Sequence, residues 1–180
     1  SSQQNSSPEV GPEMTRPDGT IVAIGGTPHN AVFDPTTMSW TALPDTPNEY
    51  ASVDGPGATL PNGDVLFAAG PQFDPTNRQT GGFDPPTVWY ELSGTTFTQV
   101  GGTTDDGDLG TYSHFLLVLP TGEVLHTQEG YSPGTTLQIY TPSPGVAANA
   151  VPEILGEPEL IGSGDEPATA PVPTLYRGRS

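Results

Sequence analysis

The sequence predicts an all-β fold built from short antiparallel strands, and three observations support this prediction. The 180 residues include 23 glycines and 22 prolines, which would interrupt a helix before it reached a stable length. Only 32% of the residues are hydrophobic, so the core must be made of short, layered elements. A turn-and-strand segment also recurs three times, which indicates repeated structural units.

The recurring segment is predicted to be a β-hairpin. It reads RPDGTIVAIGG at 16–26, LPNGDVLFAAG at 60–70 and LPTGEVLHTQEG at 119–130. Proline presets the first dihedral angle of the turn, and glycine adopts the positive φ that follows. Because an apolar run comes after the turn, we expect strands near 20–25 and 64–69.

A second strand–turn–strand segment follows each hairpin. It reads AVFDPTTMSW at 31–40 and VWYELSGTTF at 88–97, whereas LQIYTPSP at 137–144 keeps its first strand but then contains two prolines. We therefore expect further strands near 31–34 and 87–92. Two hairpins per unit give a four-stranded antiparallel sheet, which is the blade of a β-propeller.

The positions of the hairpins predict a tail, a region of three blades and a C-terminal segment. Insertions at 71–86 and 101–110 make their spacing uneven. We expect an N-terminal tail at 1–11, three blades at 12–145, and a linker with the start of a further β domain at 146–180.

The charge balance excludes several partners. Twenty-one acidic residues stand against four arginines, with no lysine, so the formal net charge is −17. Such a surface repels phosphate, so we expect neither nucleic-acid binding nor docking to anionic lipid. No apolar run is long enough for a membrane span, and the absence of cysteine excludes disulfides. We expect an acidic extracellular or cell-surface protein, with a protein kept soluble at high salt as the alternative.

Several motifs together resemble a known family. The Pro-x-Gly hairpins, Gly25–Gly26, the FDPTT segment at 33–37 and the following Trp40 resemble kelch repeats. Residues 112–125, with 138–142, are similar to the last propeller blades of the galactose oxidase-like superfamily. The resemblance implies kelch-type β-propeller blades in an incomplete ring, followed by an immunoglobulin-like domain.

The same resemblance raises the question of copper. Members of that family bind copper through a tyrosine followed directly by a histidine, shortly before the hairpin proline. Here Tyr112 occupies the first position, but Ser113 occupies the second and His114 comes one place late. Since a one-residue shift in a strand reverses the side chain, we expect that His114 cannot take the place of the family's histidine. We also expect Tyr112 and His114 to point to opposite faces of their strand. We therefore do not expect copper, and a copper-radical oxidase is the alternative function.

Calcium is the other metal that the sequence suggests. Asp105, Asp106 and Asp108 lie close together around a glycine, and hard oxygen donors on such a turn can hold Ca²⁺. A solvated acidic loop is the alternative interpretation.

The three histidines, His29, His114 and His126, show no spacing typical of metal ligands. We expect two of them at the surface and one packed in a blade.

Candidate binding residues lie in loops. Phe73, Arg78 and Phe83 belong to the insertion at 71–86, where they have no blade position to fill, and His29 lies in a loop after Gly26. Binding residues concentrate on such loops. The alternative is that the insertion packs on its own blade. The other large aromatic residues are expected to fill the space between neighbouring sheets: Trp40, Trp89, Tyr90, Phe97 and Tyr140.

Together these observations favour a non-enzymatic module that binds a glycan or a protein or serves structural assembly. Three blades would leave two apolar sheet faces open, because closed propellers use more. We therefore expect the remaining blades to come from the same longer polypeptide or from other subunits, and the chain alone to be unstable.

Overall fold

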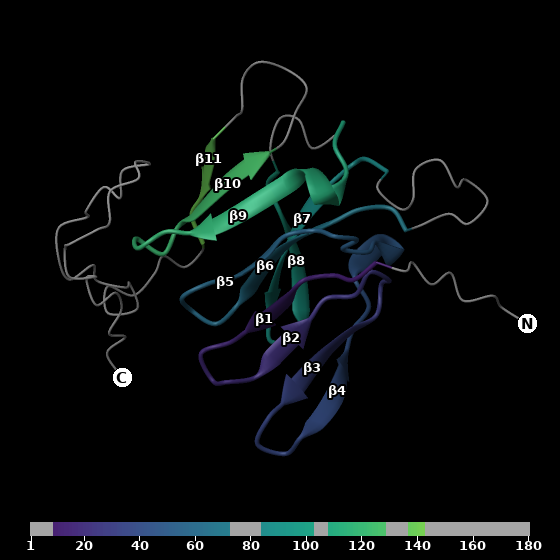
Figure 1. Ribbon diagram of the computed structural model, residues 1–180, viewed down its shortest axis with the longest axis vertical. Coiled ribbons are helices and arrows are strands. Elements are labelled where there is room, and N and C mark those ends of the chain that lie inside the picture. Colours follow the sequence, from purple (N-terminus) through teal and green to yellow (C-terminus); the bar gives the residue numbers. More distant parts are fainter. Residues whose placement is uncertain (1–8, 73–83, 103–107, 129–136, 143–180) are drawn as a thin grey trace, which may run out of the picture.

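The computed structural model describes residues 9–72, 84–102, 108–128 and 137–142 (Figure 1). These residues form an all-β structure of three antiparallel sheets, as predicted. Helical structure among them is limited to two 3₁₀ turns, η1 (Pro47–Glu49) and η2 (Thr111–Ser113). None of the described segments is a helix with the length and apolarity needed to cross a membrane.

Each sheet is a meander in which consecutive strands pair. The first contains β1 (Glu13–Thr15), β2 (Ile21–Ala23), β3 (Asn30–Asp34) and β4 (Ser39–Leu43). The second contains β5 (Gly57–Thr59), β6 (Val65–Ala69), β7 (Val88–Ser93) and β8 (Thr96–Val100). The third contains β9 (His114–Val118), β10 (Val124–Gln128) and β11 (Gln138–Tyr140). All four strands expected in the first two units, β2, β3, β6 and β7, are therefore confirmed.

The Pro-x-Gly turns form the same local structure three times. Gly19, Gly63 and Gly122 have φ angles of 86°, 89° and 82°, in the left-handed region that favours glycine. Each of these glycines donates its backbone N–H to the carbonyl oxygen three residues earlier, at 2.8–2.9 Å. The repeated turn sets equivalent registers in the three hairpins, so residues at equal distances from the glycine occupy equivalent positions.

The second sheet lies between the other two (Figure 1). All five residues of β6 are buried, because its two faces contact different sheets. Val65, Phe67 and Ala69 pack toward the first sheet, and Leu66 and Ala68 pack toward the third. At one edge of the stack β5 contacts both β1 and β9, so the first strands of the three sheets gather there.

Two clusters form the core, one at each sheet-to-sheet interface. The first joins Met14, Val22, Ile24 and Leu43 to Val65, Phe67, Ala69, Tyr90 and Leu92. The second joins Ala58, Leu60, Leu66, Ala68 and Trp89 to Val124, with Leu116, Val118, Val100 and Tyr140 packed against it. Four of the five aromatic residues expected between sheets contact these clusters. Trp40 is 57% exposed, because the outer face of the first sheet is uncovered in the described structure.

Candidate functional site

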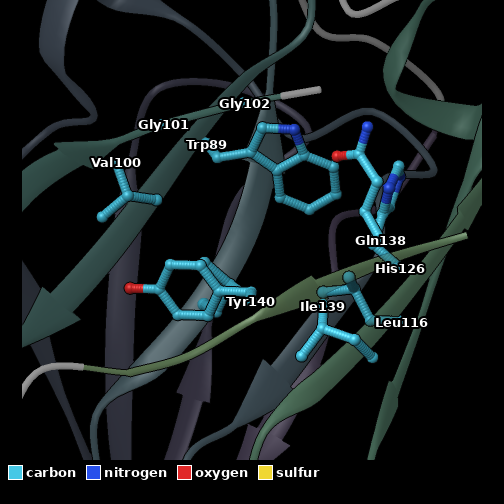
Figure 2. Close-up of a pocket in the computed structure, with 10 residues that line it drawn as sticks. Trp89, Val100, Gly101, Gly102, Leu116, His126, Gln138, Ile139 and Tyr140 are labelled. Atoms are coloured by element: carbon cyan, nitrogen blue, oxygen red, sulfur yellow. The ribbon is translucent and has the colours of Figure 1, made fainter. Parts of the chain in front are cut away.

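A pocket of about 130 Å³ lies between the second and third sheets (Figure 2). Trp89 from β7 and Tyr140 from β11 form two sides, and Figure 2 shows Gln138 and His126 at one end. Leu66, Val100 and Leu116 supply apolar surface, and Ile139, Gly101 and Gly102 complete the lining. The pocket therefore combines aromatic and aliphatic walls with a small number of polar groups, as ligand sites generally do.

Trp89 is held rigidly at the centre of this interface. Its backbone pairs with Ala68 on one side and Val100 on the other, and its side chain is buried. The indole lies nearly perpendicular to two imidazole rings, at centroid distances of 5.5 Å to His114 and 5.0 Å to His126. Packing on both sides fixes the orientation of this wall of the pocket.

His114 and His126 form a buried pair. His114 opens β9 and His126 lies in β10, and their Nδ1 and Nε2 atoms are 3.0 Å apart, within hydrogen-bond distance. In such a bond one nitrogen carries the hydrogen and the other offers its lone pair. The accepting ring must therefore be neutral, so the bonded pair carries at most one positive charge.

Tyr140 is tied to the second sheet through its hydroxyl group. The hydroxyl donates a hydrogen bond to Glu91 Oε2 on β7 at 2.5 Å. Burial raises the pKa of Tyr140, and the hydrogen bond to Glu91 and the negative charges of Glu91 and Asp64 raise this pKa further. The phenol therefore stays protonated across the physiological range and keeps this hydrogen bond between the sheets.

The predicted binding residues belong to two loops. Phe73, Arg78 and Phe83 lie outside the described residues. His29 is exposed in the loop after β2, where its Nδ1 lies 2.8 Å from Asp45 Oδ1. It does not line the pocket described above.

The residues suggested for copper do not fit a copper site. Tyr112 lies in the turn η2 and is half exposed, whereas His114 is buried beside His126. The expectation that Tyr112 and His114 share a strand is wrong, because β9 begins only at His114. The expected opposite faces do not follow from strand geometry either, because residues two apart in a strand point to the same face. Tyr112 and His114 differ in exposure because Tyr112 lies in η2, outside the strand. His114 is therefore placed with His126 and Trp89 and not with the tyrosine that the family resemblance requires.

The calcium prediction falls largely outside the structure. Asp105 and Asp106 lie outside the described residues, and Asp108 is exposed. Among the residues that the structure describes, no three His, Cys, Asp or Glu side chains are grouped as metal ligands. Calcium binding thus stays a prediction from the sequence.

The expectation for the histidines is wrong in one respect: two of the three are buried, not one. The hairpin repeat offered a signal for His126, because it stands the same number of residues after the turn glycine as Phe67, which is buried. For His114 no comparable signal exists, because it precedes the repeated turn and its burial depends on strand pairing.

The comparisons with known proteins do not assign the chain to a family. No model of a protein family matches the chain, and a search of curated proteins finds no relative.

Proposed function

We propose that this chain is part of an extracellular or cell-surface kelch-like β-propeller that binds a glycan through the pocket between the second and third sheets. The observation that supports this most is the lining of the pocket, in which Trp89 and Tyr140 stand beside the amide of Gln138. A sugar ring presents C–H groups on its faces and hydroxyl groups at its rim. Aromatic walls suit the former, and an amide, which both donates and accepts hydrogen bonds, suits the latter.

The size of the pocket and the net charge of the protein indicate which class of glycan binds. A pocket of about 130 Å³ is smaller than typical sites for whole small molecules, so it suits one terminal sugar unit of a longer chain. The net charge of −17 repels anionic sugars. A neutral or amino sugar is therefore the ligand, and a protein loop of similar chemistry is the alternative.

The arrangement of the sheets supports the propeller interpretation. Two four-stranded meanders and a third partial one are stacked face to face, with β1, β5 and β9 gathered at one edge. Blades of a propeller have this topology, with the first strands nearest the central axis. In this proposal the outer faces are covered by further blades of a longer polypeptide or of other subunits.

The binding proposal is tested with a glycan array, followed by calorimetric titration of the full chain with the sugars that bind. Gln138→Leu keeps the side-chain size but removes the amide, so we expect at least about 10-fold weaker binding. Gln99→Leu, on the exposed side of β8 and outside the pocket, is the matched control and should bind as the wild type does. A folded protein that binds no sugar, or a Gln138→Leu variant with unchanged affinity, would contradict the proposal.

The copper-radical oxidase is distinguished by a separate measurement. Metal analysis of the purified protein and an assay for hydrogen peroxide with primary alcohols should give neither stoichiometric copper nor turnover. Copper at one equivalent together with peroxide release would show that the protein is the oxidase and not a binding module.

A further inference from the structure

The buried histidine pair forms part of one side of the pocket. His126 lines the pocket and lies beside Gln138 and Trp89 in Figure 2. From the second sheet, Trp89 contacts the rings of both histidines, His114 included. The two imidazoles are themselves in contact, with centroids 5.1 Å apart, and the two residues are only 2% and 4% exposed. The packing of the third sheet on the second therefore depends on two titratable rings that lie away from water.

The hydrogen bond between the two rings limits how many protons the packed pair can hold. It joins His114 Nδ1 to His126 Nε2 at 3.0 Å, and one of these nitrogens must offer a lone pair. If both rings were charged, two N–H groups would face each other and two like charges would lie close together in a site of low polarity. The packed pair therefore holds at most one proton. Two histidines exposed to water, by contrast, each take up a proton below pH about 6.5.

The charged groups packed around the pair do not remove this limit. On the face of β7 that carries Trp89, Glu91 accepts the hydrogen bond of Tyr140. The pKa of Tyr140 is raised by burial and by Glu91, so this phenol stays neutral in acid. The other titratable groups described on or beside these elements lie at hairpin turns, in connecting segments or at the surface: Asp64, Asp84, Asp108, Tyr112 and Glu123. A carboxylate stabilises one proton on the pair, but a second proton still places N–H against N–H.

We propose that protonation of the His114–His126 pair loosens the contact between the second and third sheets, so that the pocket holds its sugar at neutral pH and releases it in mild acid. The inference rests on the glycan binding proposed above and adds its regulation. Separated rings bind two protons and the packed pair at most one, so a falling pH favours separation. The contribution of the pair to stability is thus complete at neutral pH and is lost as the pH falls below about 6.5.

Movement of β10 would reach the groups proposed to bind the sugar. His126 pairs with Gln138 across β10 and β11, and Tyr140 follows two residues later on β11. Gln138 and Tyr140 therefore move with the third sheet, whereas Trp89 stays with the second. At the first interface the position of His126 is occupied by Phe67, which does not titrate. Mild acid should thus loosen the interface that contains the pocket and leave the other one packed.

Urea unfolding of the full chain in mild acid tests the proton count without any ligand. A Trp40→Phe background leaves Trp89 as the single tryptophan, so its fluorescence follows the second interface. Relative to His114→Asn, the equilibrium constant of unfolding should rise at least about 10-fold between pH about 7 and 5. Asparagine keeps a hydrogen-bonding amide near the position of Nδ1 but does not titrate, so His126 can be charged in the folded variant. Acidic side chains titrate alike in both proteins, and the comparison removes their effect.

Calorimetric titration of the full chain tests the release. The probes are the methyl glycosides of glucose, galactose and N-acetylglucosamine, which are neutral sugars. The affinity of the wild type should fall at least about 3-fold between pH about 7 and 5, because the binding-competent population falls. His114→Asn, at a position that does not line the pocket, should bind equally at both pH values. His29→Asn removes an exposed imidazole and is the matched control, so it should lose affinity in acid as the wild type does.

Three outcomes would overturn the proposal. The first is the same pH dependence of unfolding in the wild type and His114→Asn. The second is an acid response of unfolding with an unchanged sugar affinity, which would make the pair a stabilising contact only. The third is loss of the acid response in His29→Asn. Binding of no sugar at neutral pH would contradict the glycan proposal itself, whereas the unfolding data would still decide whether acid loosens the interface. Circular dichroism checks folding, and His114→Gln replaces His114→Asn if the latter fails to fold.

Discussion

The two interfaces in the stack use the same backbone geometry but different chemistry. Between the first and second sheets, Phe67 packs among aliphatic and aromatic side chains, with rings of Tyr90 and Phe97 at 5.9 and 6.0 Å. Between the second and third sheets, the equivalent position is His126, which contacts His114 and Trp89. At this position the first interface is filled by packed apolar side chains, whereas the second contains polar groups and borders a pocket.

This difference indicates a division of roles. Close packing of large apolar side chains stabilises a structure but leaves no group with which to recognise a ligand. Replacing a phenyl ring by an imidazole introduces hydrogen-bonding atoms and weakens the apolar contact. The first interface therefore acts as the stable support, and the second carries the candidate site.

The largest effect is expected at Phe67. Phe67→Ala removes a fully buried ring from the first interface, which should lower the free energy of unfolding by about 3–5 kcal/mol. Equilibrium unfolding in urea, followed by tryptophan fluorescence and circular dichroism, measures this change. A loss below about 1 kcal/mol would mean that the first interface is not the main support.

A smaller effect is expected at the equivalent position in the second interface. His126→Ala removes the contact with Trp89 and the hydrogen bond with His114, so the free energy of unfolding should fall by about 1–3 kcal/mol. A double-mutant cycle with His114→Ala should show a coupling of about 0.5–3 kcal/mol. Additive effects of the two substitutions would show that the histidines do not act as a pair.

Buried tyrosines at both interfaces should make the free energy of unfolding fall at alkaline pH. In the folded protein the pKa of Tyr140 is raised, by burial first and then by Glu91, whereas in the unfolded chain this phenol ionises near its ordinary value of about 10. Its contribution to stability is thus complete below pH about 10 and is lost as the pH rises further. Burial also raises the pKa of Tyr90 at the first interface, so the wild type should lose stability above this pH for two reasons.

Two substitutions separate these contributions. Tyr140→Phe should make the decline of the unfolding free energy above pH about 10 less steep, and Tyr90→Phe should do so independently. Glu91→Gln keeps the Tyr140 hydroxyl but removes the negative charge beside it, so the decline should lessen but not disappear. Unfolding by urea between pH 8 and 11 measures the slopes. Identical slopes for wild type and Tyr140→Phe would contradict the raised pKa of Tyr140, and identical slopes for wild type and Glu91→Gln would contradict the role given to Glu91.

The smallest effect is expected at His29, outside both interfaces. His29 and Asp45 form an exposed contact, and such contacts add little to stability. His29→Ala should therefore leave the urea midpoint and the glycan affinity unchanged within error. A clear loss of affinity would restore His29 as a binding residue and place part of the site in the loop after β2.

The repeated hairpins show how far local sequence can predict this fold. Positive φ at Gly19, Gly63 and Gly122 is a requirement of the turn, and the alternating strands beside it follow from that turn. Those features depend on residues close together in the chain.

The candidate site depends on contacts that local sequence does not specify. His114 and His126 are 12 residues apart in sequence. They meet because His114 of β9 pairs with Gln128 of β10, and His126 lies two residues from Gln128 on the same face of β10. Trp89, which packs against both, comes from a different sheet. By itself, then, the sequence determined the turns, the strands and the all-β class, because steric limits on φ act within a few residues. Only the tertiary structure decided which side chains line the pocket, because strand register and the stacking of separate sheets bring them together.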